Sequence, residues 1–195
     1  MFVLFDLDDT LLLTSPREDA FFAAAFAEVL GRSLSTTDWA ALGASTDHAI
    51  LTALGIGPAA IEAIARAHER RWQRALLADP PPPRPGALAA LHALRAAGVP
   101  HGVATGGFAR VARRKLAVLG SDVALLATSE SGEDRAALLA YAAAQLPGRD
   151  GAYLGDGSWD HEAALACGLR FSPVGNRAGI DGPEDLRLAL SMVWP

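Results

Sequence analysis

Residues 1–12 read MFVLFDLDDTLL, and the interpretation of the whole chain starts from this stretch. Five apolar residues, typical of a buried strand, run directly into Asp6, Asp8 and Asp9. A buried carboxylate costs several kcal/mol unless a cation or hydrogen bonds compensate it. Asp6 and Asp8 are two residues apart, so the end of the strand can hold both near one point. The stretch indicates either a strand followed by an acidic turn or a metal-binding nucleophile site.

Composition narrows the class of protein. The chain has 195 residues, 51% of them hydrophobic and 20% charged, which is typical of a globular protein of one domain or one domain with an insert. A net charge of −5 argues against a broad surface for nucleic acid or anionic membrane. The longest apolar stretch, Ala20–Ala27, is too short to span a bilayer. A single cysteine, Cys167, and the lack of a signal-peptide pattern predict a cytoplasmic protein.

The first part of the chain after residue 12 has a helical pattern. Phe22, Phe26 and Val29 fall on one face of a helix expected from Pro16 to Gly31. Further helices are expected at 37–42, 46–54 and 58–77, and no strand pattern occurs between them. The proline run DPPPPRPG at 79–86 cannot form regular structure and predicts a stiff connector.

The rest of the chain alternates between strand and helix patterns. We expect strands at 99–104, 123–127, 152–154 and 170–174, and helices at 87–97, 108–119, 134–146, 159–167 and 183–192. This alternation predicts an α/β fold with a parallel sheet covered by helices on both faces. The expected division is a core of residues 1–14 and 85–195, with residues 15–84 inserted after the first strand as an all-helical domain.

Polar residues follow three of the predicted strands. Besides Asp6 and Asp8, the strand HGVA ends in Thr105-Gly106-Gly107, and the strand AYL ends in Gly155-Asp156 with Asp160 shortly after. Ligands of open α/β sheets bind beyond the carboxyl ends of the strands. Each residue also has a local explanation, as a helix cap, a turn residue or a first-turn acid. Their placement at one edge of the sheet favours a shared site.

These stretches resemble the sequence motifs of the haloacid dehalogenase (HAD) superfamily. FDLDDTLL is similar to motif I, VATGG at 103–107 to motif II, and GDGSWD at 155–160 to motif IV. GASTDHAIL at 43–51 resembles the cap loop of phosphoglycolate-phosphatase-like members. The resemblance spans nearly the whole chain, and implies a Rossmann-like, HAD-type core with a helical cap of the C1 type at residues 15–84.

Motif III is where the chain departs from the family, which usually has a lysine ahead of motif IV. The only lysine, Lys115, lies ten residues after Thr105, and we expect it on the solvent-facing surface of a helix. Arg135, 21 residues before Asp156, is the expected substitute, since a guanidinium also holds a phosphate oxygen and a carboxylate. The alternative is that Arg135 is a solvent-facing residue of a first helical turn.

The resemblance implies a Mg²⁺-dependent phosphatase in which Asp6 attacks phosphorus and becomes an aspartyl-phosphate. Asp8 would protonate the leaving oxygen and then deprotonate the hydrolytic water. The phosphate oxygens would be held by Thr105, the Gly106 amide and Arg135. The magnesium ligands would be Asp6, the backbone carbonyl of Asp8, Asp156 and Asp160.

Other activities of this superfamily fit less well. Dehalogenases work without the metal and lack the second acid of motif I, and phosphonatases need a cap lysine that this chain does not have. A sugar phosphomutase and a non-catalytic binding protein remain open alternatives.

The partner predicted by the sequence is a small phosphorylated metabolite, such as phosphoglycolate, a sugar phosphate or a nucleotide, bound by a monomer or homodimer. Arg17, Asp47, His48 and His68 of the helical insert are candidates for substrate contact. We expect Trp159 to pack rather than to recognise substrate.

Overall fold

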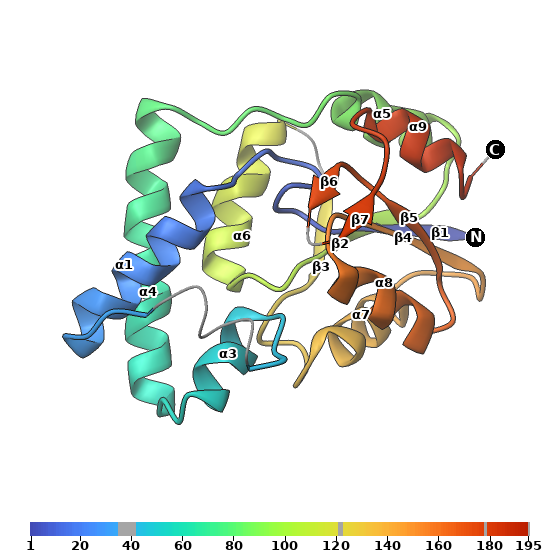
Figure 1. Cartoon of the computed structure of the whole chain (residues 1–195). Helices are drawn as coiled ribbons and strands as arrows, with labels where there is room; N and C mark the ends of the chain where they lie inside the picture. Colours follow the sequence, from blue (N-terminus) through green and yellow to red (C-terminus); the bar gives the residue numbers. More distant parts are fainter. Residues whose placement is uncertain (35–41, 121–122, 178, 195) are drawn as a thin grey trace.

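The computed structural model describes residues 1–34, 42–120, 123–177 and 179–194. Its main sheet has five parallel strands in the order β3–β2–β1–β4–β5. The strands are β1 (Phe2–Phe5), β2 (His101–Ala104), β3 (Ala124–Ala127), β4 (Gly151–Gly155) and β5 (Arg170–Pro173). β1 therefore lies at the centre of the sheet, between β2 and β4, and the acids that follow it leave the sheet at its central strand. Figure 1 shows the sheet with its covering helices.

Helices cover both faces of the sheet, which confirms the predicted α/β fold. Val3 and Phe5 pack in a cluster with α5 (Ala87–Ala96), α6 (Ala109–Leu116) and α9 (Leu186–Ser191). Phe2 and Leu4 point to the other face, where α7 (Arg135–Ala143) and α8 (Ser158–Ala166) lie. Successive strand residues point to opposite faces, so a strand buried on both sides is apolar throughout, as β1 is.

Four described helices lie in the chain between β1 and β2. The last, α5, packs on the sheet, and the first three form a separate block: α1 (Arg17–Leu30), α3 (Asp47–Ala53) and α4 (Pro58–Ala78). Phe22 and Phe26 of α1 share a hydrophobic cluster with Trp72 of α4, and Phe108 and Val111 join it from the core side. This helical block occupies one side of the molecule and the sheet the other (Figure 1). The arrangement is that of a cap. The helix expected at 37–42 falls almost wholly outside the described residues.

The two connections between the core and the cap run side by side. The Leu13 amide donates to the Pro82 carbonyl (3.0 Å), and the Arg84 amide donates to the Leu11 carbonyl (2.9 Å). The proline run thus forms a paired connector where the chain returns from α4. We keep residues 15–84 as the proposed extent of the cap.

Some local structure differs from the sequence prediction. The expected helix at 108–119 is α6 followed by a 3₁₀ turn at Ala117–Leu119. A two-stranded antiparallel hairpin, β6 (Asn176–Arg177) and β7 (Ile180–Asp181), was not predicted, because strands of two residues have no measurable periodicity. Within the described part of the chain, no helix has the length and apolar character needed to cross a lipid bilayer.

Candidate active site

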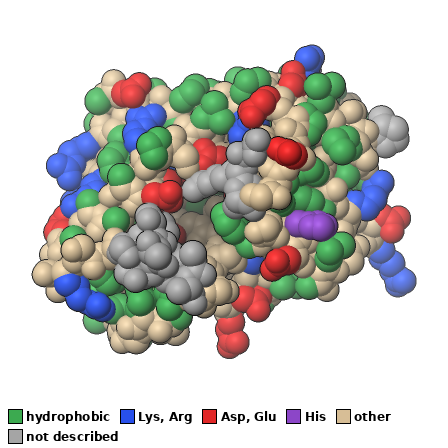
Figure 2. All heavy atoms as spheres, viewed as in Figure 1, with side chains coloured by type: hydrophobic (Ala, Val, Ile, Leu, Met, Phe, Trp, Pro, Cys, Tyr) green, Lys and Arg blue, Asp and Glu red, His purple; other side chains and the backbone are tan. Residues whose placement is uncertain are grey.

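A cavity of about 820 Å³ opens where the carboxyl ends of the central strands meet the cap. Asp6, Asp8, Thr105, Gly106, Arg135 and Asp156 all line it. Asp160 lies beneath these residues, with no exposed surface. In the space-filling view the surface is hollowed between α3 of the cap and the α7–α8 side of the core, with acidic side chains around the hollow (Figure 2). The structure therefore brings the residues predicted from three separate strand ends to one place.

Three of these acids form a compact buried cluster. Carboxylate oxygens of Asp6, Asp156 and Asp160 all lie within 4.8 Å of one another, and each residue is at most 3% exposed. Burial raises the pKa of Asp6 well above its usual value; Arg135 opposes this shift, and the carboxylates of Asp160 and Asp156 add to it. Hard oxygen ligands that repel one another and are shielded from water suit a divalent cation. The donor set thus fits a metal ion.

Arg135, the first residue of α7, points into the cluster. Its Nη1 lies 3.4 Å from Oδ1 of Asp6, and its Nε lies 3.1 Å from Oδ1 of Asp160. The side chain of Asp134 caps α7 by accepting a hydrogen bond from the Ala137 amide (2.8 Å), which fixes where the helix begins. Arg135 is 7% exposed, so it is not the solvent-facing residue of the alternative interpretation.

Asp160 is held by protein donors on both oxygens. The Tyr153 hydroxyl lies 3.0 Å from Oδ1, and the Gly157 amide donates to Oδ2 (3.1 Å). Burial, and then Asp160, raises the pKa of Tyr153 well above its usual value, so the hydroxyl keeps its proton. We did not anticipate Tyr153 from the sequence. A polar residue in the middle of the otherwise apolar strand AYL was the available signal.

The loop after β2 also lines the cavity, and β2 is the neighbour of β1 in the sheet. Thr105 is buried, and its Oγ1 accepts a hydrogen bond from the Gly107 amide (3.3 Å). A Cβ atom on Gly106 would lie 2.7 Å from the Ser45 carbonyl oxygen and 2.9 Å from Nη1 of Arg135. Only glycine leaves room there for both the cap loop and the guanidinium.

The side chain of Asp8 turns away from the acidic cluster and toward the cap. Its Oδ1 accepts from Nζ of Lys115 at 2.7 Å, and Lys115 also donates to Glu18 of α1. The Lys115 ammonium lies 4.5 Å from the centre of the Trp72 ring. Burial alone would lower the pKa of Lys115, but Asp8 and Glu18 outweigh it and hold this pKa above its usual value.

The expected surface position of Lys115 is therefore wrong, because the residue is only 1% exposed. Its helix, α6, packs on the sheet with one face, and the cap helix α4 covers another. The sequence shows the first of these faces as an apolar stripe. The sequence does not show that the cap covers the second face of α6, where Glu18, 97 residues before Lys115, meets the lysine.

Glu18 was also missed by the sequence interpretation. Its Oε2 accepts from Nε1 of Trp72 (2.7 Å), and its Oε1 lies 3.3 Å from Nε2 of His68. His68 is fully buried, and burial together with Lys115 lowers its pKa to about 3, so the ring is neutral at pH 7. Glu18 lies four residues before Phe22, on the buried face of α1, and this position was the available signal.

Among the cap candidates, Asp47 lines the cavity, whereas Arg17, His48 and His68 are not among its lining residues. Oδ2 of Asp47 accepts from the Phe108 amide (3.1 Å), and the Asp47 amide donates to the Gly106 carbonyl (2.8 Å). This acid therefore joins the cap to the loop after β2. Arg17 instead pairs with Asp79 (3.1 Å) near the connector.

Asp9, the third acid after β1, shapes the loop. Its Oδ1 accepts hydrogen bonds from the amides of Thr14 (2.9 Å) and Ser15 (3.0 Å). Its φ of 55° is in the left-handed region, which an aspartate tolerates better than most residues do. Asp9 does not line the cavity, in agreement with the structural role of a turn residue.

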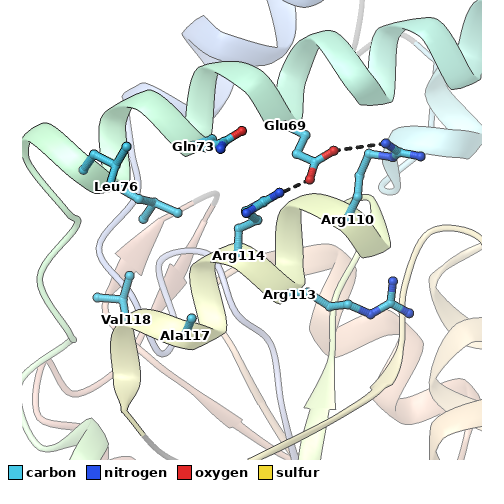
Figure 3. Close-up of a pocket in the computed structure, with 9 residues that line it drawn as sticks. Glu69, Gln73, Leu76, Arg110, Arg113, Arg114, Ala117 and Val118 are labelled. Carbon is cyan, nitrogen blue, oxygen red and sulfur yellow. Dashed lines mark hydrogen bonds and ion pairs between the residues drawn. The ribbon is translucent and has the colours of Figure 1, made fainter.

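A second hollow, of about 640 Å³, lies between α4 and α6. Glu69 accepts there from Nη1 of Arg110 (3.0 Å) and from Nε of Arg114 (2.9 Å), as Figure 3 shows. These ion pairs join the cap helix to the core helix. The hollow holds none of the residues predicted for the site.

Comparisons with known proteins agree with this geometry. The family model for haloacid dehalogenase-like hydrolases matches residues 1–168. No curated protein matches the chain in sequence.

Solved structures share the fold over almost the whole chain. A hydrolase from Pseudomonas syringae is 19% identical and superposes with a TM-score of 0.76, covering 98% of both chains. CbbY from Rhodobacter sphaeroides, crystallised with xylulose-(1,5)bisphosphate, is 20% identical with a TM-score of 0.73, covering 92% of this chain and 93% of that one. A predicted phosphoglycolate phosphatase from Haemophilus somnus is 17% identical with a TM-score of 0.65, covering 97% and 90%.

Proposed function

The chain belongs to the haloacid dehalogenase-like hydrolases, and from that premise we propose that it is a Mg²⁺-dependent phosphatase acting on a small phosphomonoester. The observation that carries the proposal is the position of Asp6. It ends the central strand, lines the cavity, and lies beside both Arg135 and a cluster of two further carboxylates. The nucleophile, a cation and the metal-binding acids are thus on one side of one cavity.

Asp6 is the proposed nucleophile. Its carboxylate attacks phosphorus, the ester oxygen leaves, and an aspartyl-phosphate forms that water then hydrolyses. Because Arg135 lies against Asp6, it offsets part of the repulsion between the carboxylate and an incoming phosphate. Arg135 also keeps Asp6 oriented, and Asp160 in turn keeps Arg135 oriented.

The phosphate oxygens would be held by the loop after β2 and by Arg135. The Thr105 hydroxyl and the Gly106 amide are the proposed donors, together with the guanidinium of Arg135. The position that a Cβ of Gly107 would take lies 3.8 Å from Oδ2 of Asp8 and 3.8 Å from Oγ1 of Thr105. The proposed proton donor and a proposed phosphate ligand therefore both lie beside Gly107.

Asp8 is the proposed acid and base. Its Oδ2 faces the cavity side near Thr105, while its Oδ1 is held by Lys115. It would give a proton to the leaving oxygen and later take one from the attacking water. This division leaves Asp6 free to act only as the nucleophile.

The metal would be held by Asp6, Asp156, Asp160 and the backbone carbonyl of Asp8. When bound, Mg²⁺ would neutralise the clustered carboxylates and the phosphate charge. Asp160 is the most constrained of these ligands, since Tyr153 and the Gly157 amide already hold its oxygens.

The charge of the cavity favours some substrates over others. Eight of its described lining residues are acidic, and Arg135 is the only basic one among them. Like charges in contact across an interface cost several kcal/mol. We therefore favour an ester whose leaving alcohol is uncharged or cationic. A second phosphate, as a sugar phosphomutase requires, has no described cation on the cap side of the cavity to bind it.

The cellular location is proposed from the cysteine content. A single free cysteine, Cys167, suits a reducing compartment, and we keep the cytoplasm as the proposed location.

Hydrolysis of p-nitrophenyl phosphate with Mg²⁺ tests the proposal. We expect turnover that EDTA abolishes and added Mg²⁺ restores. Asp6→Asn should lower kcat by at least about 10³-fold, because the amide cannot act as nucleophile. Asp181→Asn, on the exposed hairpin strand β7, is the matched control and should keep full activity. Full activity of Asp6→Asn would refute the mechanism. Absence of turnover for every phosphate ester tried would favour the non-catalytic binding protein.

A further inference from the structure

A buried lysine bridges the core and the cap next to the proposed acid. Lys115 donates to Asp8, which follows the central strand, and to Glu18, which belongs to the first cap helix. Lys115 is distant in the sequence from both partners, by 107 residues from Asp8 and by 97 from Glu18. The ammonium group therefore adds a buried contact between core and cap to the more exposed ion pairs of Glu69 and the hydrogen bonds of Asp47.

The lysine is held rigidly. Its side chain is 1% exposed, its Nζ has two carboxylate partners, and the Trp72 ring lies on a further side at 4.5 Å. Trp72 in turn donates its Nε1 to Glu18 at 2.7 Å. Lys115, Glu18 and Trp72 thus form a closed set of contacts that fixes where the ammonium group sits.

This set acts on one oxygen of Asp8 and leaves the other accessible. Oδ1 of Asp8 is bound to Nζ at 2.7 Å. Oδ2 lies 3.8 Å from the position that a Cβ of Gly107 would take, and the same position is 3.8 Å from Oγ1 of Thr105 and 3.9 Å from Oδ2 of Asp47. A carboxylate with one oxygen held cannot rotate freely, so the second oxygen of Asp8 stays on the side of the loop after β2, where Thr105 also lines the cavity.

We propose that Lys115 is a positioning residue for the proton-transfer step, and that Glu18 makes the cap part of this device. Lys115 does not contact substrate. It aims Oδ2 of Asp8 at the leaving oxygen, and it does so only while Glu18 of α1 lies against α6. The proposal rests on the proposed function, because it takes Asp8 as the proton donor.

Dependence on the leaving group separates positioning from simple structural support. p-Nitrophenolate is stable enough at neutral pH to leave without a proton, whereas an alkoxide is not. Two esters of nearly the same size, p-nitrophenyl phosphate and p-nitrobenzyl phosphate, differ in this respect. A misplaced Asp8 should slow cleavage of the benzyl ester much more than cleavage of the phenyl ester, while a damaged fold should slow both equally.

We expect Lys115→Met to lower kcat/KM for p-nitrobenzyl phosphate by about 100-fold and kcat/KM for p-nitrophenyl phosphate by less than about 5-fold, the range of a general-acid effect. The ratio of kcat/KM values reports ester cleavage and not the later hydrolysis of the aspartyl-phosphate, which is the same intermediate for both esters. Glu18→Gln keeps the size of the side chain and one acceptor oxygen but removes the charge. It should change the ratio of the two kcat/KM values in the same direction by about 5-fold. Arg114→Met, on the same helix but paired with Glu69, is the matched control and should leave the ratio unchanged.

A double variant tests whether Lys115 works through Asp8. In an Asp8→Asn background no proton donor is left to position, so adding Lys115→Met should not change the ratio further. An equal loss for both esters in the single variants, or a further change of ratio in the Asp8→Asn background, would overturn the proposal. If Lys115→Met does not fold, Glu18→Gln and its combination with Asp8→Asn give the same test. Lack of wild-type activity on both esters would refute the proposed function instead.

Discussion

Each side of the cavity places a buried cation between two carboxylates, but the two sides are built differently. On the core side, Arg135 of α7 contacts Asp6 and Asp160, and all three belong to the α/β core. On the cap side, Lys115 of α6 contacts Asp8 of the core and Glu18 of the cap. The first arrangement depends on the ends of adjacent strands. The second exists only while the cap lies on the core.

This difference separates two tasks. The core side concentrates negative charge that the protein does not fully neutralise, which suits metal and phosphate binding. The cap side pairs its lysine with two acids and supports the position of Asp8. A change on the core side should therefore act mainly on chemistry, whereas a change on the cap side should act on stability and on the proton-transfer step.

The largest expected effect is on the core side. Arg135→Met should lower kcat/KM for p-nitrophenyl phosphate by about 10³-fold, because a preorganised cation aimed at the transferring group is lost. Arg135→Lys should recover only part of the loss, since an ammonium cannot contact Asp6 and Asp160 with the planar geometry of a guanidinium. Initial rates at saturating Mg²⁺ measure this. Equal activity of Arg135→Met and wild type would remove Arg135 from the mechanism.

On the cap side the expected effect is on folding. Lys115→Met leaves Asp8 and Glu18 in a buried environment without their cation, and it should lower the free energy of unfolding by about 3 kcal/mol. Urea denaturation followed by circular dichroism measures the change. Arg114→Met, which removes a pair whose arginine is 46% exposed, should cost less than about 1 kcal/mol. If the two variants lost similar amounts of unfolding free energy, the buried ion pairs of Lys115 would stabilise the fold no more than the exposed pair of Arg114 does.

The smallest effect contrasts the pH dependence of stability on the two sides. The pKa of Asp6 is raised in the folded state, so without metal the folded protein keeps a proton that the unfolded chain loses. Stability from this group falls as pH rises from the usual carboxyl pKa through the raised value. In EDTA, Asp6→Asn should therefore be more stable than wild type at pH 7, with the difference vanishing near pH 3.

The contribution of Lys115 to stability also falls as pH rises, but in a higher pH range. Its folded pKa is above the usual value, so its contribution is fully present at neutral pH and is lost only as pH rises through the folded pKa. Urea unfolding of wild type, Asp6→Asn and Lys115→Met at several pH values in EDTA measures both trends. If wild type were more stable than Asp6→Asn in EDTA at pH 7, the inferred repulsion between Asp6 and the carboxylates of Asp156 and Asp160 would be contradicted.

The parts of the site that could be predicted are those at strand ends. Asp6, Thr105 and Asp156 each follow a short apolar run, and parallel strands deliver their carboxyl ends to one edge whatever the rest of the chain does. Arg135 could be anticipated only through the family resemblance, which implies a cation ahead of Asp156, together with the chemistry of its guanidinium. Tyr153 could not, because a tyrosine in a buried strand gives no sign of which polar group its hydroxyl will meet.

The cap-side residues were hidden for a different reason. Hydrophobic periodicity reports which face of a helix is buried against its own domain, and for α6 it indicated the face toward the sheet. The face that carries Lys115 is covered by a domain inserted at another point in the chain. A lysine reads as solvent-exposed by default, because an ammonium is seldom buried without paired acids. Those acids, Asp8 and Glu18, are identified as partners only by the tertiary contact.

The sequence by itself determined the α/β core, the helical insert and the acids at the central strand end, because these follow from local patterns and from the rule that parallel strands share an edge. Only the tertiary structure decided how the acids divide their work. It placed Asp6 with Asp156, Asp160 and Arg135, and it turned Asp8 toward Lys115 and Glu18. The reason is physical: burial and charge pairing depend on which distant surfaces meet, and no local pattern records that.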